Sequence, residues 1–251
     1  MLNKLKTKIL IDYLYQKEKY FMNNSIIDYT LLDNNASIKD IKTLCEKANQ
    51  LEVKTVCVMP KHVKIASETL KGSSVLVCSV VSFPSGETST EEKITEMKSL
   101  VLNGADEIDV VWNYKKINDL DYLRNELEQL AQIKAKLKTT KGELPVLKVI
   151  VESGLLNLEQ TEKATEICIK AGVDFIKTST GKVEVGAEID KVKLMRKIIQ
   201  SYPSDLKVKA SGGIRNLEQF NAFEPYVDRF GIGYASVDEM NGIQSNSGND
   251  Y

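Results

Sequence analysis

The chain contains a single histidine, His62, and its four cysteines form no CxxC pair. Catalytic zinc sites usually draw on two or three histidines or on clustered cysteines, so this composition argues against a zinc-dependent enzyme. A Ser-His-Asp triad would have to use His62, which stands between lysines at the expected start of a helix, Pro60–Lys64. We therefore expect no metal site and look for chemistry that needs neither metal nor histidine.

Cysteine usage, net charge and the lack of long apolar runs restrict the binding partners and the cellular compartment that we expect. The cysteines, Cys45, Cys57, Cys78 and Cys168, indicate no disulfide framework, which is typical of a reducing cytoplasm. Lysine and arginine together (34) almost balance the acidic residues (35), so no nucleic-acid or membrane surface is expected. Apolar runs near the start, such as Ile9–Ile11, are too short for a signal-peptide core or a membrane span.

Short β-branched runs alternate with helical patterns over the 251 residues. Such alternation predicts parallel strands joined by right-handed helical crossovers, and eight units favour a single-domain (β/α)8 TIM barrel over residues 1–251. An open doubly wound sheet is the competitor, but its glycine-rich nucleotide motifs are absent from the sequence. The expected strands are Ile26–Leu32, Thr55–Val58, Val75–Val81, Glu107–Val111, Val146–Val151, Phe175–Thr178, Lys207–Ala210 and Arg229–Gly231.

Capping signals locate the helices between these strands. Ser37 with Asp40, and Ser89 with Glu92, resemble capping boxes, and Asn157 begins a further helix that ends near Gly172. Apolar stripes follow each signal, beginning in the first helix with Ile38. Residues 1–24 are expected to form an additional N-terminal helix that covers one end of the fold, and residues 241–251 a mobile polar tail.

Four successive strands send charged side chains toward the barrel interior. Because strand side chains alternate, the apolar residues face the helices and Asp109, Lys148, Lys177 and Lys209 face inward. Unpaired buried charges cost several kcal/mol, about the scale of the protein's own stability. The cluster is either a satisfied structural ion network or a catalytic site. Three cations facing one anion, or two if Glu152 joins Asp109, favour catalysis.

Lys177 is the candidate nucleophile, because a neutral lysine amine attacks carbonyl groups to form imines. Burial favours the neutral amine, and we expect Lys209 on the adjacent strand to lower the pKa of Lys177 further by charge repulsion. Asp109 and Lys148 are then candidates for proton transfer. The plainer interpretation, a strand-end lysine that reaches solvent, does not explain the other three inward charges.

Glycine-rich turns after the last three strands predict a phosphate site. Barrels frequently bind phosphate in the loops after strands seven and eight, where backbone N–H groups approach the anion. Two of the four arginines flank these turns. The candidate residues are Gly181, Lys182, Gly212, Gly213, Arg215, Gly231 and Gly233.

Four segments together make the chain resemble the deoxyribose-phosphate aldolases: Gly104–Val111, Leu147–Glu152, Ala171–Lys182 and Lys209–Arg215. The resemblance covers about Asp28 to Gly231 and implies a class I aldolase on a (β/α)8 barrel. It matches Lys177 to the Schiff-base lysine, Asp109 to the proton relay, Lys209 to the tuning lysine and Lys148 to a lysine near the reacting carbons. It also implies a substrate pocket made of Asp28, Thr30, Leu32, Cys57 and Thr180.

The resemblance implies reversible cleavage of 2-deoxy-D-ribose 5-phosphate to D-glyceraldehyde 3-phosphate and acetaldehyde, without cofactor or metal. The partner is then a small phosphosugar, and a homodimer is left open. One departure and one further match concern the ends of the site. Ile232, Gly233 and Tyr234 stand where the family often has a serine pair, and the terminal Tyr251 matches a tail tyrosine that aids proton transfer in some members. The alternatives are a phosphosugar isomerase or epimerase, and a non-catalytic phosphosugar-binding barrel.

Overall fold

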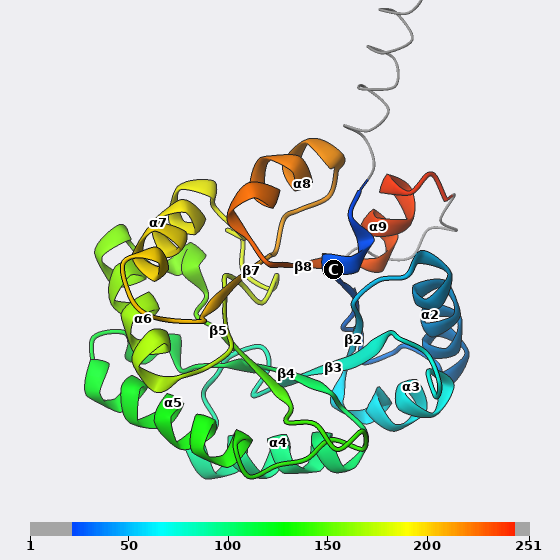
Figure 1. The fold of residues 1–251 in the computed structure, drawn as a ribbon, viewed down its shortest axis with the longest axis horizontal. Coiled ribbons are helices and arrows are strands. Elements are labelled where there is room, and N and C mark those ends of the chain that lie inside the picture. The colour runs from blue at the N-terminus through cyan, green and yellow to red at the C-terminus, as the bar shows by residue number, and fades with distance from the viewer. Residues whose placement is uncertain (1–21, 244–251) are drawn as a thin grey trace, which may run out of the picture.

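A computed structural model describes residues 22–243 of the chain. Within this range eight parallel strands pair in chain order, and β8 pairs with β1 to close a barrel. The helices form a ring outside the strands (Figure 1). The predicted (β/α)8 barrel is confirmed, whereas the single-domain assignment of the whole chain stays a prediction. Residues 1–21 of the expected N-terminal extension, and residues 244–251 of the tail with Tyr251, lie outside the described range.

The eight strands lie where the sequence predicts them, and no end differs by more than two residues. The longest discrepancy is at the end of the last strand, which continues past Gly231 to Gly233. The bounds are β1 Ile27–Leu31, β2 Thr55–Val58, β3 Leu76–Val81, β4 Glu107–Val111, β5 Val146–Ile150, β6 Phe175–Lys177, β7 Lys207–Ser211 and β8 Arg229–Gly233.

Helices connect successive strands and cover their outer face. The α-helices are α2 Ile38–Leu51, α3 Val63–Thr69, α4 Thr90–Leu102, α5 Leu120–Lys134, α6 Leu158–Ala171, α7 Ile189–Gln200, α8 Leu217–Phe223 and α9 Tyr234–Met240. Five 3-10 turns join them: η1 Asn24–Ile26, η2 Pro60–His62, η3 Tyr114–Lys116, η4 Ser153–Leu155 and η5 Glu224–Tyr226. Helix α9 was not predicted, because its seven residues follow a glycine and carry no capping side chain.

The predicted helix starts are confirmed. Ser37 and Asp40 form a reciprocal capping box on α2, and Ser89 with Glu92 does the same on α4. Asn157 caps α6, which ends at Gly172 in the left-handed region that glycine tolerates best. Ile38 is an exception to the predicted stripe, since it is 62% exposed in the first turn of α2.

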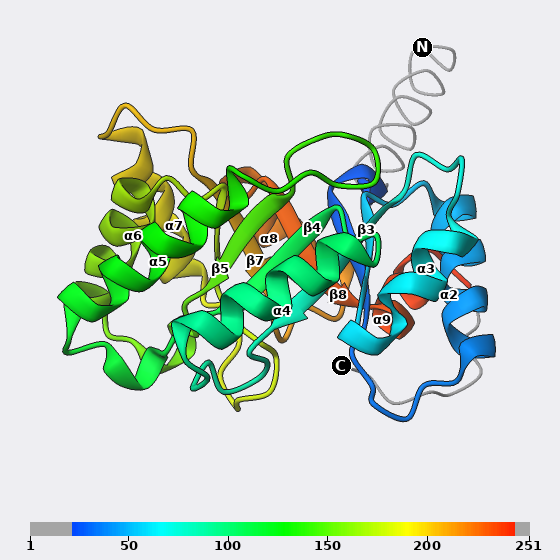
Figure 2. The same ribbon diagram turned by 90° about the horizontal axis from the view of Figure 1, so that it is seen from below.

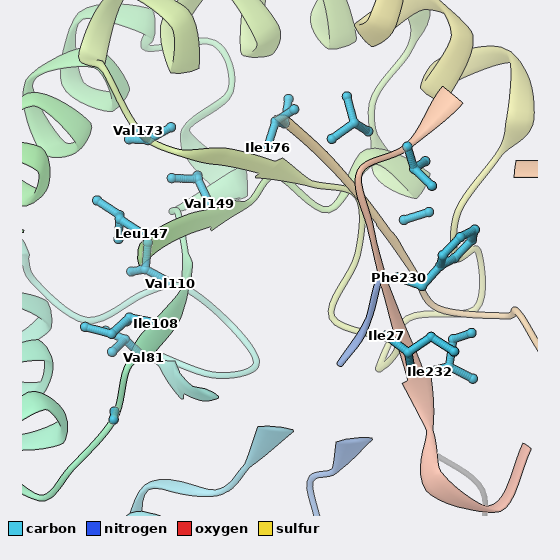
Figure 3. Packing of buried hydrophobic residues seen from close by; sticks show 14 of the residues in the cluster. Ile27, Val81, Ile108, Val110, Leu147, Val149, Val173, Ile176, Phe230 and Ile232 are labelled. Atoms are coloured by element: carbon cyan, nitrogen blue, oxygen red, sulfur yellow. The ribbon is translucent and has the colours of Figure 1, made fainter. Parts of the chain in front are cut away.

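Apolar side chains on alternate strand positions pack against the helices. Ile108 and Val110 of β4 and Leu147 and Val149 of β5 lie together on the outer side of their strands (Figure 3). Helices α4 and α5 lie across this outer side (Figure 2). No helix within residues 22–243 is long and apolar enough to cross a membrane. The opposite face of the same strands forms the barrel interior, where the charged residues collect.

Candidate active site

The four inward-facing charges meet at the carboxylate of Asp109. Lys177 Nζ lies 2.8 Å and Lys209 Nζ 2.7 Å from Asp109 Oδ2, while Lys148 Nζ lies 2.7 Å from Oδ1. The strand register explains the meeting, because Asp109 pairs with Lys148 and Lys177 pairs with Lys209 on neighbouring strands. Lys177 is 2% exposed and the other three are fully buried.

A second layer of charges lies next to this cluster. Asp28 on β1 accepts from Lys209 and, at 2.6 Å, from Arg229 Nη1 on β8. Glu107 on β4 lies 2.7 Å from Lys148 Nζ and 2.9 Å from Arg229 Nη1. The expected pocket residue Asp28 is therefore engaged in an ion network inside the barrel. Glu107 and Arg229 were not predicted to take part in this network.

The alternation of strand side chains, which identified Asp109, also indicates that Glu107 and Arg229 face the barrel interior. Glu107 stands two residues before Asp109 on β4 and so points to the same face. Arg229 precedes the outward-facing Phe230, which places it on the inner face of β8. Both residues begin strands whose first residues were predicted correctly, so the inward direction of their side chains was within reach of the sequence.

The charge imbalance that the structure shows inside the barrel is smaller than the sequence indicated. Within the described residues the network holds four cations (Lys148, Lys177, Lys209 and Arg229) and three carboxylates (Asp28, Glu107 and Asp109). The excess is therefore one positive charge, and each charged group has at least one partner. Charge imbalance alone no longer separates a catalytic cluster from a structural network.

The lysines keep Asp109 ionised. Burial raises the pKa of Asp109, but the ammonium groups of Lys148, Lys177 and Lys209 outweigh it and hold the pKa well below its ordinary value. Lys148 responds in the opposite sense. Burial lowers its pKa, and the carboxylates of Asp109, Asp28 and Glu107 raise it well above the usual range.

The expectation that Lys209 depresses the pKa of Lys177 is wrong for this structure. Burial does lower the pKa of Lys177, but the Asp109 carboxylate at 2.8 Å outweighs it, so the pKa lies above the ordinary value. Lys209 is itself paired with Asp28 and Asp109, which neutralise its effect on its neighbour. Lys177 is therefore an ammonium held by Asp109.

An apolar wall lines the interior beside the charges. Leu32, Cys57, Cys78 and Val80 form a buried cluster of their own, and Met59 and Phe83 pack against it. Two of the predicted pocket residues, Leu32 and Cys57, thus lie together. Thr30 is also buried, and its hydroxyl donates to the Asp28 carbonyl oxygen at 2.8 Å. A small apolar fragment would find a matching surface here.

Two sets of side chains in the described range could offer a metal three donor atoms within 4.8 Å of one another. One set is Cys57, Cys78 and Asp109, and the other is Asp28, Cys78 and Glu107. Their carboxylates already accept hydrogen bonds from lysine or Arg229, as the distances above show. A bare dication would have to compete with these cations, so the donor set fits an ion network better than a resident metal.

The loops after β6 and β7 lie side by side at the open end of the barrel. Gly181, Gly212 and Gly213 have φ values of 74°, 84° and 80°, a region that favours glycine. A Cβ on Gly212 would lie 3.4 Å from the Cα of Gly181 and 3.2 Å from Gly186, so the backbones approach closely. The structure therefore brings these three predicted residues together.

Thr180 and Glu152 fix the start of the first loop. The Thr180 hydroxyl donates to Glu152 Oε2 at 2.5 Å, and its backbone N–H also donates to this carboxylate. Burial raises the pKa of Glu152, and the hydrogen bonds from Thr180 only partly offset this effect. The next residue but one, Lys182, is exposed and directs its backbone N–H to the Thr180 hydroxyl at 3.1 Å.

Gly231 lies inside strand β8, not in the loop after it. A Cβ at Gly231 would lie 2.9 Å from Lys209 Cε and 3.0 Å from Ser211 Cβ, so the missing side chain makes room for Lys209. Its place in the strand differs from the predicted loop position, and its part in a phosphate site stays a prediction. Gly233 ends the strand before α9, and Arg215 is exposed beyond the second loop.

A hollow of about 520 Å³ opens above the apolar wall. It shares Leu32, Met59 and Phe83 with the cluster around Cys57 and Cys78. Lys182 from the loop after β6 and Tyr234 from the start of α9 lie on its rim. The hollow therefore lies between the side chains that cover the cysteine cluster and the loop that carries Lys182.

Comparison with known proteins gives one consistent result. The family model described as "DeoC/LacD family aldolase" matches residues 24–228. The deoxyribose-phosphate aldolase of Mycoplasmoides pirum is 43% identical over 195 residues, which are 77% of this chain and 85% of that protein. The deoxyribose-phosphate aldolase of Staphylococcus carnosus is 42% identical over 224 residues, 88% of this chain and 96% of that protein.

Solved structures agree with the sequence relatives. One described as "QR15, an Aldolase" superposes with a TM-score of 0.77 at 36% identity and covers 88% of this chain and 96% of its own. The deoxyribose phosphate aldolase from Aeropyrum pernix, described as tetrameric, gives a TM-score of 0.76 at 27% identity, with coverage of 87% and 89%.

Proposed function

The chain belongs to the DeoC/LacD family of aldolases, and from this membership and the buried lysine cluster we infer a deoxyribose-phosphate aldolase. Its reaction is the reversible cleavage of 2-deoxy-D-ribose 5-phosphate to D-glyceraldehyde 3-phosphate and acetaldehyde. The observation that carries the chemistry is Lys177 Nζ, held 2.8 Å from Asp109 inside the barrel, at the end of β6.

Lys177 is the proposed imine-forming residue. It must lose a proton before it attacks C1 of the substrate, and it is the lysine that the network can most readily release. Lys177 has one carboxylate partner, whereas Lys209 has two and Lys148 has three. When Lys177 is neutral, three cations face three carboxylates, and Asp109 keeps its other two partners.

Asp109 is the proposed proton relay. It takes the proton from the C3 hydroxyl, through water, as the C2–C3 bond breaks and glyceraldehyde 3-phosphate leaves. The protonated imine on Lys177 accepts the electron pair and becomes an enamine, which is then protonated and hydrolysed to acetaldehyde. Because the lysines keep the pKa of Asp109 low, the carboxyl group passes the proton on instead of storing it.

The phosphate end of the substrate is assigned to the adjoining loops. Gly181, Gly212 and Gly213 supply backbone N–H groups in glycine-only conformations, and Lys182 on the rim supplies positive charge. Gly233 and Arg215 complete the proposed set. Leu32, Cys57 and Thr30 are proposed to line the path of the two-carbon fragment, and Lys148 and Lys209 to hold Asp109 in position.

The setting of the enzyme is also a proposal. The four cysteines are free thiols in the structure, which supports a reducing compartment such as the cytoplasm. The imine provides the electron sink for C–C cleavage, so the mechanism calls for no metal. Self-association as a homodimer is proposed from the sequence alone, and sedimentation equilibrium would separate it from the tetramer described for the Aeropyrum pernix relative.

Trapping of the imine tests the proposal. Incubation with acetaldehyde and sodium borohydride should add one ethyl group to Lys177, located by peptide mass mapping. Lys93 is the matched control, because it is also fully buried and paired with a carboxylate, Glu126, but lies on α4 outside the barrel. Lys177→Leu should remove both the adduct and the turnover while the far-ultraviolet circular dichroism stays unchanged. An adduct on another lysine, or turnover by Lys177→Leu, would refute the assignment.

A further inference from the structure

Cys57 and Cys78 are neighbours inside the barrel. They are paired residues on the adjacent parallel strands β2 and β3, and both are fully buried. Their Sγ atoms lie within 4.8 Å of each other. Cys78 also donates to Asp109 Oδ1 at 3.2 Å and accepts from Lys148 Nζ at 3.2 Å.

This arrangement satisfies the backbone geometry of a disulfide bond. Neighbouring strands lie roughly 4.7–4.9 Å apart. Disulfides form between Cα atoms about 4.4–6.8 Å apart whose Cβ vectors do not point apart. Paired residues on parallel strands point to the same face, and here that face is the interior. The two side chains therefore start from neighbouring positions on one face of the sheet.

The two thiols differ in reactivity in the way that a two-step oxidation requires. The polar side chain of Cys78 beside it lowers the pKa of Cys57 more than burial raises it, and the ammonium groups of Lys209 and Lys177 lower it further. Burial raises the pKa of Cys78 well above its usual value. Of the two cysteines, Cys57 forms the thiolate more readily, and Cys78 stays a protonated thiol next to it.

One layer of side chains separates Cys57, which is fully buried, from the hollow at the barrel mouth. The cysteine lies in the apolar cluster with Leu32, and Met59 and Phe83 pack against that cluster. Leu32, Met59 and Phe83 also line the hollow of about 520 Å³ at the barrel mouth. In contrast, Cys45 belongs to α2 and Cys168 to α6, both packed in the layer between strands and helices.

We propose that Cys57 and Cys78 form an oxidative modification site that reacts with a hydroperoxide and closes to a disulfide within the barrel. The Cys57 thiolate attacks the peroxide O–O bond, which gives a sulfenic acid and releases hydroxide that takes up a proton to become water. The Cys78 thiol then displaces a second water from the sulfenic acid and forms the S–S bond. Two thiols and one hydrogen peroxide thus yield one disulfide and two waters.

Oxidation should also stop the reaction at the neighbouring lysines, a consequence that rests on the proposed function. The disulfide removes the S–H donor from Asp109 and moves the sulfur that accepts from Lys148. It also alters the wall beside Lys177. Formation of the bond itself is independent of the aldolase assignment, because it is measured by mass.

The experiment treats the reduced full-length protein with hydrogen peroxide and maps its peptides without reduction. We expect a Cys57–Cys78 cross-linked peptide, the loss of two hydrogen atoms from the intact mass, and a fall in aldolase rate of at least about tenfold. Dithiothreitol should restore the rate, since thiol exchange reverses disulfides but not higher sulfur oxides. Each variant's rate is normalised to its own untreated rate.

Two variants distinguish the outcomes. In Cys78→Ala the sulfenic acid on Cys57 has no neighbouring thiol, so peroxide should drive it to sulfinic acid, and dithiothreitol should fail to restore activity. Cys45→Ser/Cys168→Ser should behave like the unmodified chain. Reduced wild-type protein that gives no cross-linked peptide overturns the proposal whatever the activity. A cross-link without loss of rate preserves the modification site and refutes its effect on the reaction.

Discussion

Replacement of Glu107 by glutamine tests whether the second layer of charges holds the barrel interior together. Glu107 is 1% exposed, and its carboxylate meets Lys148 at 2.7 Å and Arg229 at 2.9 Å. Glutamine keeps the shape but removes one negative charge, so four cations would face two carboxylates. One amide hydrogen-bond donor would also point at the donors of Arg229 or Lys148.

The expected loss of stability is large because the ion pairs of Glu107 are buried. Removal of one partner from a buried ion pair typically costs about 3–5 kcal/mol, since it leaves the other charge uncompensated. The matched control is Glu87→Gln. Glu87 pairs with Lys115 at a similar distance of 2.8 Å, but the two side chains are 48% and 61% exposed. Exposed pairs contribute about 0–1 kcal/mol, so this change should be nearly silent.

Urea unfolding followed by circular dichroism gives both free energies, and a double-mutant cycle isolates the interaction. Glu107→Gln/Arg229→Met removes one charge of each sign and returns the excess to one positive charge. The double variant should therefore lose less stability than the two single changes added together. Additive losses, or a Glu107→Gln cost no larger than that of Glu87→Gln, would refute the account of the network as a balanced set of charges.

Two further changes test the space and the protonation of the cluster. Gly231→Ala should cost about 1–3 kcal/mol of stability and lower turnover, because the new Cβ overlaps Lys209 Cε at 2.9 Å; an unchanged melting temperature and rate would contradict this role. The stability contributed by Lys177 should be fully present below the unfolded lysine pKa of about 10.4 and be lost as pH rises through the higher folded pKa. Unfolding free energies measured across alkaline pH should therefore fall less steeply in Lys177→Met than in the unmodified chain, and parallel curves would exclude Asp109 as the cause of the shift.

The fold was predictable because its signals are local. Capping residues such as Ser37, Ser89 and Asn157 mark helix starts within four residues, and each confirmed cap needs no knowledge of distant parts of the chain. Alternation within a strand likewise decides which side chains face inward. Helix α9 was not predicted, because it has no capping side chain and follows a strand whose end was predicted two residues too early.

The sequence indicates which charged residues face the barrel interior, but not which of them form ion pairs with one another. Side-chain alternation gives the inward direction of Asp109, Lys148, Lys177 and Lys209. It does not give the stagger between strands, which decides which charges come into contact. The sign of the pKa shift of Lys177 depends on that contact. Asp109 lies 2.8 Å away, and Lys209 is occupied by Asp28, a residue 181 positions distant in the chain.

The spacing along β6 and β7 links the two ends of the proposed substrate. Lys177 and Lys209 are paired on these strands, and each strand continues directly into a glycine loop, so the two loops leave the barrel as neighbours. The close approach of Gly181 and Gly212 shows that the backbone itself sets this juxtaposition. An anion held by the loops would therefore direct the rest of its molecule toward Lys177, with a separation fixed by three or four residues of strand and turn. Because both ends lie on the same short segments, the motif Ala171–Lys182 carries the proposed imine-forming residue and part of the proposed anion site together, which is why so short a stretch of sequence is informative.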